Sequence, residues 1–134
     1  MRYNNKYYNV KTRTSDGLVH DSTLEARRWE QLLLLQRAGK ITDLKRQVRF
    51  ELLPNQYETR ERYSDKTGNR LKDEVKLIER KVEYVADFTY TDADTGELVV
   101  EDTKSAATMT PEFIIKKKLM YAIHGIKVKI VSRC

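Results

Sequence analysis

Tyr84-Val85-Ala86-Asp87-Phe88 and Leu98-Val99-Val100-Glu101-Asp102-Thr103-Lys104 are the two stretches that decide how this 134-residue chain folds. Both are rich in the β-branched and aromatic residues that favour strands. The turn-forming residues Asp92-Ala93-Asp94-Thr95-Gly96 lie between them. The pattern therefore predicts a β-hairpin with strands over residues 82–90 and 97–103.

The length of the hairpin loop determines which side chains face each other. If the loop is the four residues Ala93 to Gly96, Asp87 lies directly across from Asp102, with the Cβ atoms about 5 Å apart. Lys104 is two residues beyond Asp102 and points to the same face. A three-residue loop would shift the register by one and separate the two aspartates.

Two carboxylates and a lysine on one face of a hairpin suggest a metal site. Like charges directly across a sheet are destabilising, and a divalent cation such as Mg²⁺ would remove the repulsion between Asp87 and Asp102. Lys104 could then stabilise developing charge or orient an attacking water. These are the parts needed to hydrolyse a phosphodiester.

The alternative is that these are solvated charges on an edge strand. An acid-x-Lys triplet is common, and Asp43-Leu44-Lys45 and Glu74-Val75-Lys76 also match it in this chain. The triplet Asp102-Thr103-Lys104 differs in having a strand before it, the hairpin partner Asp87 and a basic helix after it. Both interpretations stay open on spacing alone.

Two helices are predicted outside the hairpin. Ser22-Thr23-Leu24-Glu25 fits a capping box, so a helix should run from about Thr23 to Ala38. Thr110-Pro111-Glu112 has a cap, a proline and an acid in the order expected at a helix start. Phe113, Ile114, Leu119 and Ile123 should form its buried side, and Gly125 should end it.

The remaining strands complete an α/β fold. Residues 47–52 alternate like a strand, and Ile126, Val128 and Ile130 alternate near the end of the chain. The element order is α-β-β-β-α-β, which predicts a mixed β-sheet flanked by helices. Residues 14–134 should form one domain after a basic arm over residues 1–13.

One charged insert interrupts this domain at about residues 55–80. Residues 58–80 hold 13 charges in 23 positions, with a turn signal at 65–69. We expect an exposed hairpin or flap there, serving as a DNA-contacting element or a dimer element.

Glu25 has two interpretations. It can be the reciprocal half of the capping box, returning its carboxylate to the helix start. Alternatively, it points inward toward Asp87 and Asp102, because its neighbours at i+4 and i+7 are the apolar residues Trp29 and Leu32.

The chain is basic, with 26 Lys and Arg against 20 Asp and Glu and a net charge of +6. Residues 1–13 contribute +4, residues 111–134 contribute +5 and the middle is −3. Basic ends suit a polyanion such as nucleic acid. The alternatives are a disordered tail at the start and a solvated helix face for the lysines. The candidate DNA-binding residues are Arg2, Lys6, Lys11, Arg13, Lys116, Lys117 and Lys118.

Composition excludes several other classes. Hydrophobic runs such as Leu32 to Leu35 and Leu119 to Ile123 are far shorter than the about 20 residues of a membrane span. The first residues lack the apolar core of a secretory signal. Cys134 is the only cysteine, so an internal disulfide is excluded. With the two histidines it gives three ligands, one fewer than a closed Cys/His zinc site needs. We expect a cytoplasmic protein.

With these residues in place, the chain resembles the PD-(D/E)xK nuclease superfamily. More closely, it is similar to small bacteriophage proteins that are akin to archaeal Holliday junction resolvases. The matching stretches are residues 20–26, 44–50, 84–88, 100–104 and 113–131, which leave only residues 55–80 largely unmatched. The proline of the motif name is replaced by Ala86.

The resemblance implies a restriction-endonuclease-like core and assigns roles to site residues. Asp87 and Asp102 would bind Mg²⁺ or Mn²⁺ with the Thr103 backbone carbonyl, and Lys104 would activate water or steady the transition state. Glu25 would complete the site directly or through water. Gln47 matches a glutamine often seen near such sites.

The function implied is a metal-dependent endodeoxyribonuclease, acting on branched DNA such as Holliday junctions during phage recombination or packaging. Relatives of this type work as homodimers. The alternatives are a nuclease without junction preference and a non-catalytic DNA-binding protein that has kept the fold.

Overall fold

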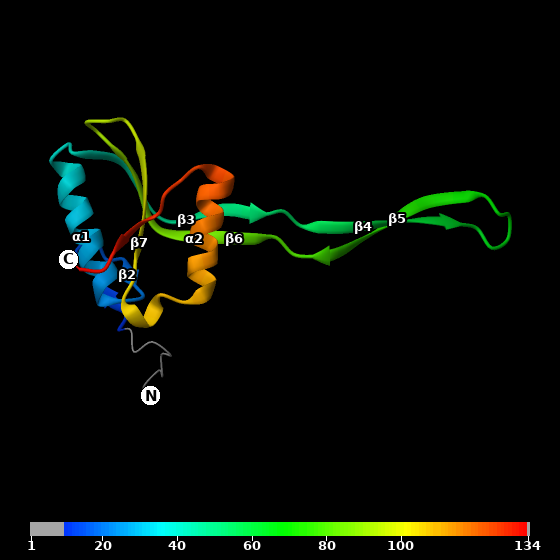
Figure 1. Ribbon diagram of the computed structural model, residues 1–134, viewed down its shortest axis with the longest axis horizontal. Helices are drawn as coiled ribbons and strands as arrows, with labels where there is room; N and C mark the ends of the chain where they lie inside the picture. Colours follow the sequence, from blue (N-terminus) through cyan, green and yellow to red (C-terminus); the bar gives the residue numbers. More distant parts are fainter. Residues whose placement is uncertain (1–9, 134) are drawn as a thin grey trace. The chain divides into compact units, whose positions relative to one another are not determined.

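The computed structural model describes residues 10–133, and the chain divides into two compact units. One unit comprises the residues up to Phe50 together with those from Tyr84 onward, and the other comprises Glu51–Glu83. Together they form a mixed α/β protein with two α-helices (Figure 1). The candidate DNA-binding residues Arg2 and Lys6 lie outside the described residues.

The central feature of the first unit is a four-stranded sheet in the order β3-β6-β7-β8. Its strands are β3 (Ile41–Leu53), β6 (Val82–Asp92), β7 (Leu98–Thr103) and β8 (Lys129–Val131). β6 and β7 are antiparallel, whereas β7 and β8 are parallel because helix α2 connects them. The predicted mixed sheet is confirmed, but β3 begins six residues before the predicted start at residue 47.

Both helices begin and end at the predicted signals. Helix α1 (Thr23–Arg37) starts at Ser22, whose hydroxyl accepts a hydrogen bond from the Glu25 N–H at 3.0 Å. Helix α2 (Pro111–His124) starts at Thr110 and ends at Gly125, which has φ 68°. That left-handed conformation favours glycine, because it has no Cβ to clash.

The buried side of α2 differs from the prediction. Phe113 is buried as expected, but Ile114 and Ile123 are 40% and 47% exposed. Met120 is buried in their place, because it lies seven residues after Phe113 and so shares its face of the helix. The main cluster of buried residues is Trp29, Leu32, Ile41, Phe88 and Tyr90, contributed by α1, β3 and β6.

Three short elements were not predicted. β1 (Thr12–Arg13) and β2 (Val19–His20) pair in antiparallel fashion around a turn at residues 15–17. A 3₁₀ helix, Ala106–Thr108, follows β7. Strands of two residues carry too little alternation to be recognised from sequence.

The second unit is a two-stranded antiparallel ribbon of β4 (Gln56–Tyr63) and β5 (Arg70–Glu79), which we call the ribbon. It corresponds to the hairpin expected for the charged insert. Every residue of β4 is exposed, and so is every residue of β5 except the half-buried Asp73. No helix among residues 10–133 is long and apolar enough to cross a membrane.

Candidate active site

The register of β6 and β7 brings the two predicted aspartates together. The Asp92 N–H donates to the Glu97 carbonyl at 2.9 Å, closing the four-residue loop, and Phe88 pairs with Glu101. One step further along this register, Asp87 faces Asp102. The hairpin interpretation with the four-residue loop is therefore confirmed.

Asp102 is almost fully buried at the end of β7, with 2% of its surface exposed. The Tyr84 hydroxyl donates to its Oδ2 at 2.6 Å, and Lys104 Nζ lies 2.8 Å from its Oδ1. That Oδ1 accepts no well-aligned hydrogen bond in the described part of the chain. Within the described residues, Lys104 therefore neutralises Asp102 at this oxygen, while Tyr84 satisfies the other one.

Asp87 is oriented by Thr103. Its Oδ2 accepts hydrogen bonds from both the backbone N–H and the hydroxyl of Thr103, each at 2.8 Å. Burial, and then the charge of Asp102, raise the pKa of Asp87 from 3.8 to about 6. Sequence reasoning had expected the Thr103 carbonyl as a ligand and missed the two Thr103 donors that hold Asp87.

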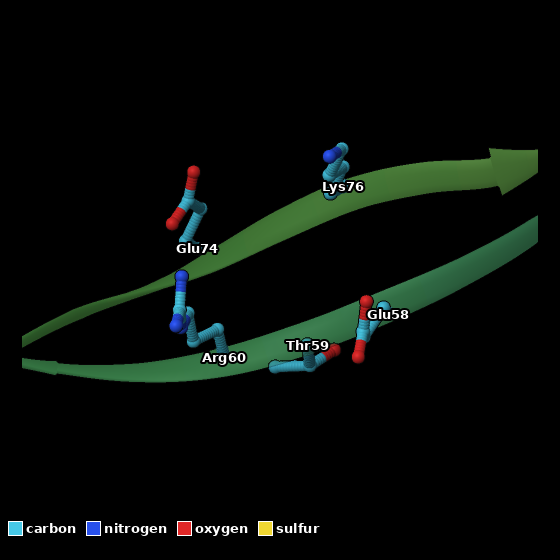
Figure 2. Close-up of a pocket in the computed structure, with 5 residues that line it drawn as sticks. All are labelled: Glu58, Thr59, Arg60, Glu74 and Lys76. Atoms are coloured by element: carbon cyan, nitrogen blue, oxygen red, sulfur yellow. The ribbon is translucent and has the colours of Figure 1, made fainter.

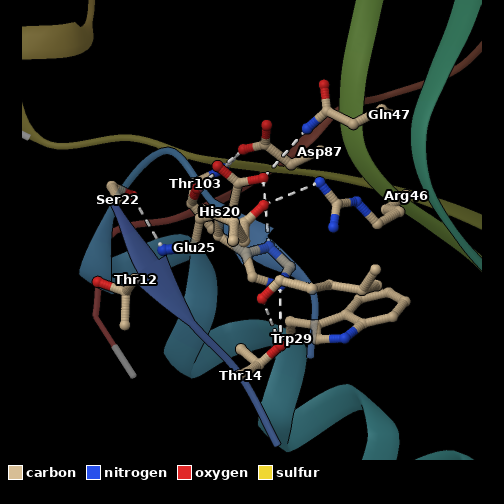
Figure 3. Close-up of polar contacts among 12 residues, drawn as sticks. Thr12, Thr14, His20, Ser22, Glu25, Trp29, Arg46, Gln47, Asp87 and Thr103 are labelled. Carbon is tan, nitrogen blue, oxygen red and sulfur yellow. Dashed lines mark hydrogen bonds and ion pairs between the residues drawn. The ribbon is translucent and has the colours of Figure 1, made fainter. Parts of the chain in front are cut away.

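Glu25 points into the site from the first turn of α1 (Figure 3). Its Oε1 accepts a hydrogen bond from Gln47 Nε2 at 3.1 Å and lies 3.7 Å from Nδ1 of the buried His20. Burial, and then the charges of Asp87 and Asp21, raise its pKa to about 7. The structure thus favours the inward orientation, while Ser22 still caps the helix.

Gln47 reaches Glu25 because of an unusual backbone conformation. It has φ 53°, which lies in the left-handed region, although it stands inside β3. A residue other than glycine pays a steric cost there, and such residues concentrate at functional sites. No sequence signal for this conformation exists, because glutamine has no preference for it.

His20 was assigned no role from sequence, and the structure buries it beside the site. It packs near Trp29 and Phe88, and its Nε2 lies 3.2 Å from the Thr14 hydroxyl. Its Nδ1 has no hydrogen-bond partner among the described residues. Burial, together with the charge of Arg46, lowers its pKa, so it is neutral near pH 7.

Glu101, the other buried acid on β7, shows how the fold neutralises a carboxylate that has a purely structural role. Glu101 is fully buried, and Arg28 donates to both its oxygens, at 2.7 and 2.8 Å. The Tyr90 hydroxyl is also hydrogen-bonded to it. By contrast, no Lys or Arg among residues 10–133 forms an ion pair with Asp87 or Glu25. The fold neutralises Glu101 with an ion pair, whereas Asp87 and Glu25 feel Lys104 and Arg46 only from a longer distance.

The site offers carboxylate oxygens, which are ligands that Mg²⁺ prefers, but only a small number of carboxylates could contact one ion. Within residues 10–133, no group of three or more His, Cys, Asp or Glu side chains is arranged to hold a metal ion. Mg²⁺ is often bound by one or two carboxylates and completed by water. Asp87 and Asp102, which face each other across β6 and β7, fit that mode.

The predicted DNA-binding lysines do not lie on one surface. Lys116 forms an ion pair with Glu112 at 3.0 Å and lines a hollow of about 210 Å³ with Lys104 and Tyr84. Lys117 and Lys118 line a different hollow. Lys11 precedes β1, and Arg13 lies in it and donates to the Gly17 carbonyl at 3.0 Å.

Comparison with known proteins identifies a family without a described activity. No curated protein and no solved structure matches the chain. A family model described as "Protein of unknown function (DUF1064)" matches residues 4–134, which is nearly the whole sequence. The chain therefore belongs to the DUF1064 family.

Proposed function

We propose that this protein is a metal-dependent endodeoxyribonuclease with a restriction-endonuclease-like core. The observation that carries the proposal is the group formed by the buried carboxylates Glu25 and Asp102 and the half-buried Asp87, beside Lys104. Burial and, after it, the charges of the neighbouring carboxylates raise the pKa of Glu25 to about 7 and that of Asp87 to about 6. Perturbed acids of this kind concentrate at functional sites.

The residues present fit a divalent cation. Asp87 and Asp102 would hold Mg²⁺ or Mn²⁺, with the Thr103 carbonyl and Glu25 as further ligands, directly or through water. When bound, the metal would supply Lewis-acid polarisation of the phosphate and of a water molecule. Among residues 10–133, Asp87 is held by the Thr103 donors and by no Lys or Arg ion pair, and this supports the assignment.

The surrounding side chains have orienting roles in the proposal. Tyr84 fixes Asp102, Thr103 fixes Asp87 and Gln47 fixes Glu25, each by the hydrogen bonds described above. Lys104 stands against Asp102 and also over the Phe113 ring at 4.5 Å. From there its ammonium group can stabilise negative charge on a phosphate or orient the attacking water.

DNA is the proposed substrate, and a Holliday junction is the proposed preferred form. The net charge of +6 favours a polyanion, and Lys104 and Lys116 line the same hollow. Junction preference and homodimeric action rest on the resemblance to phage and archaeal resolvases. A nuclease without junction preference is the nearest alternative, and equal lengths of linear and branched DNA separate the two.

The direct test is cleavage of a labelled four-way junction in the presence of Mg²⁺. The protein should cut it, EDTA should stop the reaction, and Asp87→Asn should lower the rate by at least about 100-fold. Asp94→Asn is a matched control, because it is the same change on an exposed loop residue of the same hairpin. No cleavage by the unmodified protein would refute an enzymatic role.

A non-catalytic DNA-binding protein is the second candidate, and it predicts a different response. Without catalysis, Asp87→Asn would leave DNA affinity unchanged or raise it, because it removes a negative charge near phosphate. Asp87 and Glu25, which form no Lys or Arg ion pair within the described residues, contrast with the neutralised Glu101 and favour the enzyme.

A further inference from the structure

The ribbon has an exposed apolar face. Tyr57 pairs with Leu77, and Thr59 pairs with Val75 two residues further along, so these residues lie on one side of the two strands. Tyr57, Val75 and Leu77 are 59%, 63% and 42% exposed. Two-stranded hairpins are at best marginally stable in water, so such a face gains from being covered.

The opposite face carries charged side chains, and their positive and negative charges balance. Glu58 pairs with Lys76, and Arg60 pairs with Glu74, so opposite charges stand across the strands. These four side chains and Thr59 line a hollow of about 340 Å³ (Figure 2). Each cation there has an acid as its cross-strand neighbour, which leaves no excess positive charge for phosphate.

Positive and negative charges also balance over the whole second unit. Residues 51–83 contain eight acidic and eight basic residues, so the net charge of +6 belongs entirely to the rest of the chain. A ribbon that enters a DNA groove needs an excess of Lys and Arg to neutralise phosphates. The ribbon therefore suits a neutral partner with an apolar surface.

Another exposed apolar surface is less suited to self-association. Ile114, Tyr121, Lys117, Lys118 and Lys127 line a hollow of about 530 Å³ between α2 and the chain near β8. Placing two copies of this surface together would oppose their lysines. The repulsion between like charges disfavours such a contact.

We propose that the apolar face of the ribbon is a self-association surface and that its partner is the same face on a second copy of this chain. Tyr57, Val75 and Leu77 of the two copies would pack together, and the paired charges of the other faces would stay in water. Toward the turn this face becomes polar, with Arg70 Nη2 3.7 Å from Glu61 and 3.2 Å from Asp73. Such a polar edge around an apolar centre is typical of protein interfaces.

The proposal does not depend on the nuclease function, because it can be tested without DNA or metal. Analytical ultracentrifugation of the full chain over a range of concentrations should show a monomer–dimer equilibrium, with a dimer of twice 15.8 kDa. Val75→Glu should weaken the dimer at least about tenfold, because it buries an unpaired charge. Lys76→Gln lowers the charge by the same amount on the opposite face and should leave the dimer unchanged.

A second measurement covers the case in which a variant folds poorly. Hydrogen exchange of the unmodified protein should slow at high concentration for amides of β4 and β5, and not for those of α2. A chain that stays monomeric at all concentrations would overturn the proposal, as would equal weakening by both variants. A monomer whose DNA affinity falls with Lys76→Gln but not with Val75→Glu would instead make the ribbon a DNA-binding arm.

Discussion

At the scale of single residues, the site is defined by which buried charges are neutralised. Glu101 has a bidentate arginine, and Asp102 has Lys104 and Tyr84. Asp87 and Glu25 have hydrogen bonds from Thr103 and Gln47 but no cationic partner within the described residues. Burial of an uncompensated carboxylate costs stability and is retained where the charge is used.

Glu25→Gln should therefore stabilise the metal-free protein at pH 8. The pKa of Glu25 is about 7 in the folded state against 4.5 ordinarily, so the native state binds more protons and stability falls as pH rises from 4.5 through 7. Glutamine cannot ionise and so does not suffer this loss. The free energy of unfolding should therefore rise by on the order of 1–3 kcal/mol at pH 8, and by much less near pH 4.5. Urea unfolding in EDTA at both pH values measures it.

The opposite ordering would contradict the burial of an ionised Glu25. A gain at pH 4.5 that vanishes at pH 8 would mean that the folded state prefers the charged carboxylate. Repeating the urea unfolding with Mg²⁺ in place of EDTA tests the metal site separately. A variant that loses a metal ligand should lose the stabilisation that the metal gives.

Tyr84→Phe should destabilise the protein, because it removes the only hydrogen-bond donor described for the buried Asp102 Oδ2. Loss of a hydrogen bond to a buried charged group costs about 1–3 kcal/mol. Tyr63→Phe is the matched control, since its hydroxyl donates to Glu61 at an exposed position, and it should change the free energy of unfolding by less than about 0.5 kcal/mol. Equal effects in the two variants would rule out this role for Tyr84.

At the scale of elements, local signals set the helix ends while packing sets their buried faces. Ser22 caps the start of α1 and Gly125 follows the end of α2, as the sequence predicts. The buried face of α2 was predicted correctly at Phe113 but wrongly at Ile114 and Ile123, because its apolar residues are spread around the helix and only the neighbouring elements determine which are covered. An apolar stripe is a weak guide when isoleucines lie on two sides.

Ser22→Ala should cost about 1 kcal/mol of stability, since the Glu25 N–H loses its acceptor at the start of α1. The effect should extend to activity, because the first turn of α1 positions Glu25. Ser132→Ala, at an exposed position near the end of the chain, should change stability by less than about 0.5 kcal/mol. Thermal unfolding and the junction assay measure the two consequences, and an unchanged melting temperature for Ser22→Ala would exclude a stabilising cap.

At the scale of the whole chain, charge is divided between the two units. The ribbon is neutral, and the remaining residues carry the full +6. DNA affinity should therefore depend on the first unit, whereas association between copies should depend on the second.

Salt dependence of DNA binding tests this division. Lys118→Gln should lower the slope of log affinity against log salt by up to about 0.9, the value for one lost phosphate contact. Lys66→Gln removes the same charge from the ribbon turn and should leave the slope unchanged. An equal reduction by both variants would place DNA on the ribbon as well.

The sequence by itself determined the hairpin of β6 and β7, the two helices with their caps, and the candidates Asp87, Asp102 and Lys104. These depend on turns and caps, whose signals lie within a few residues of one another. The register of the hairpin was one of two that the sequence allowed, and the structure selected the four-residue loop. The direction of the Glu25 side chain and the roles of Gln47, Tyr84 and Thr103 were decided only by the tertiary structure. They depend on contacts such as the one between Gln47 and Glu25, 22 residues apart, and on a left-handed backbone that no local preference encodes. Burial likewise comes from the packing of α1 against the sheet, and burial is what turns ordinary acids into a perturbed site.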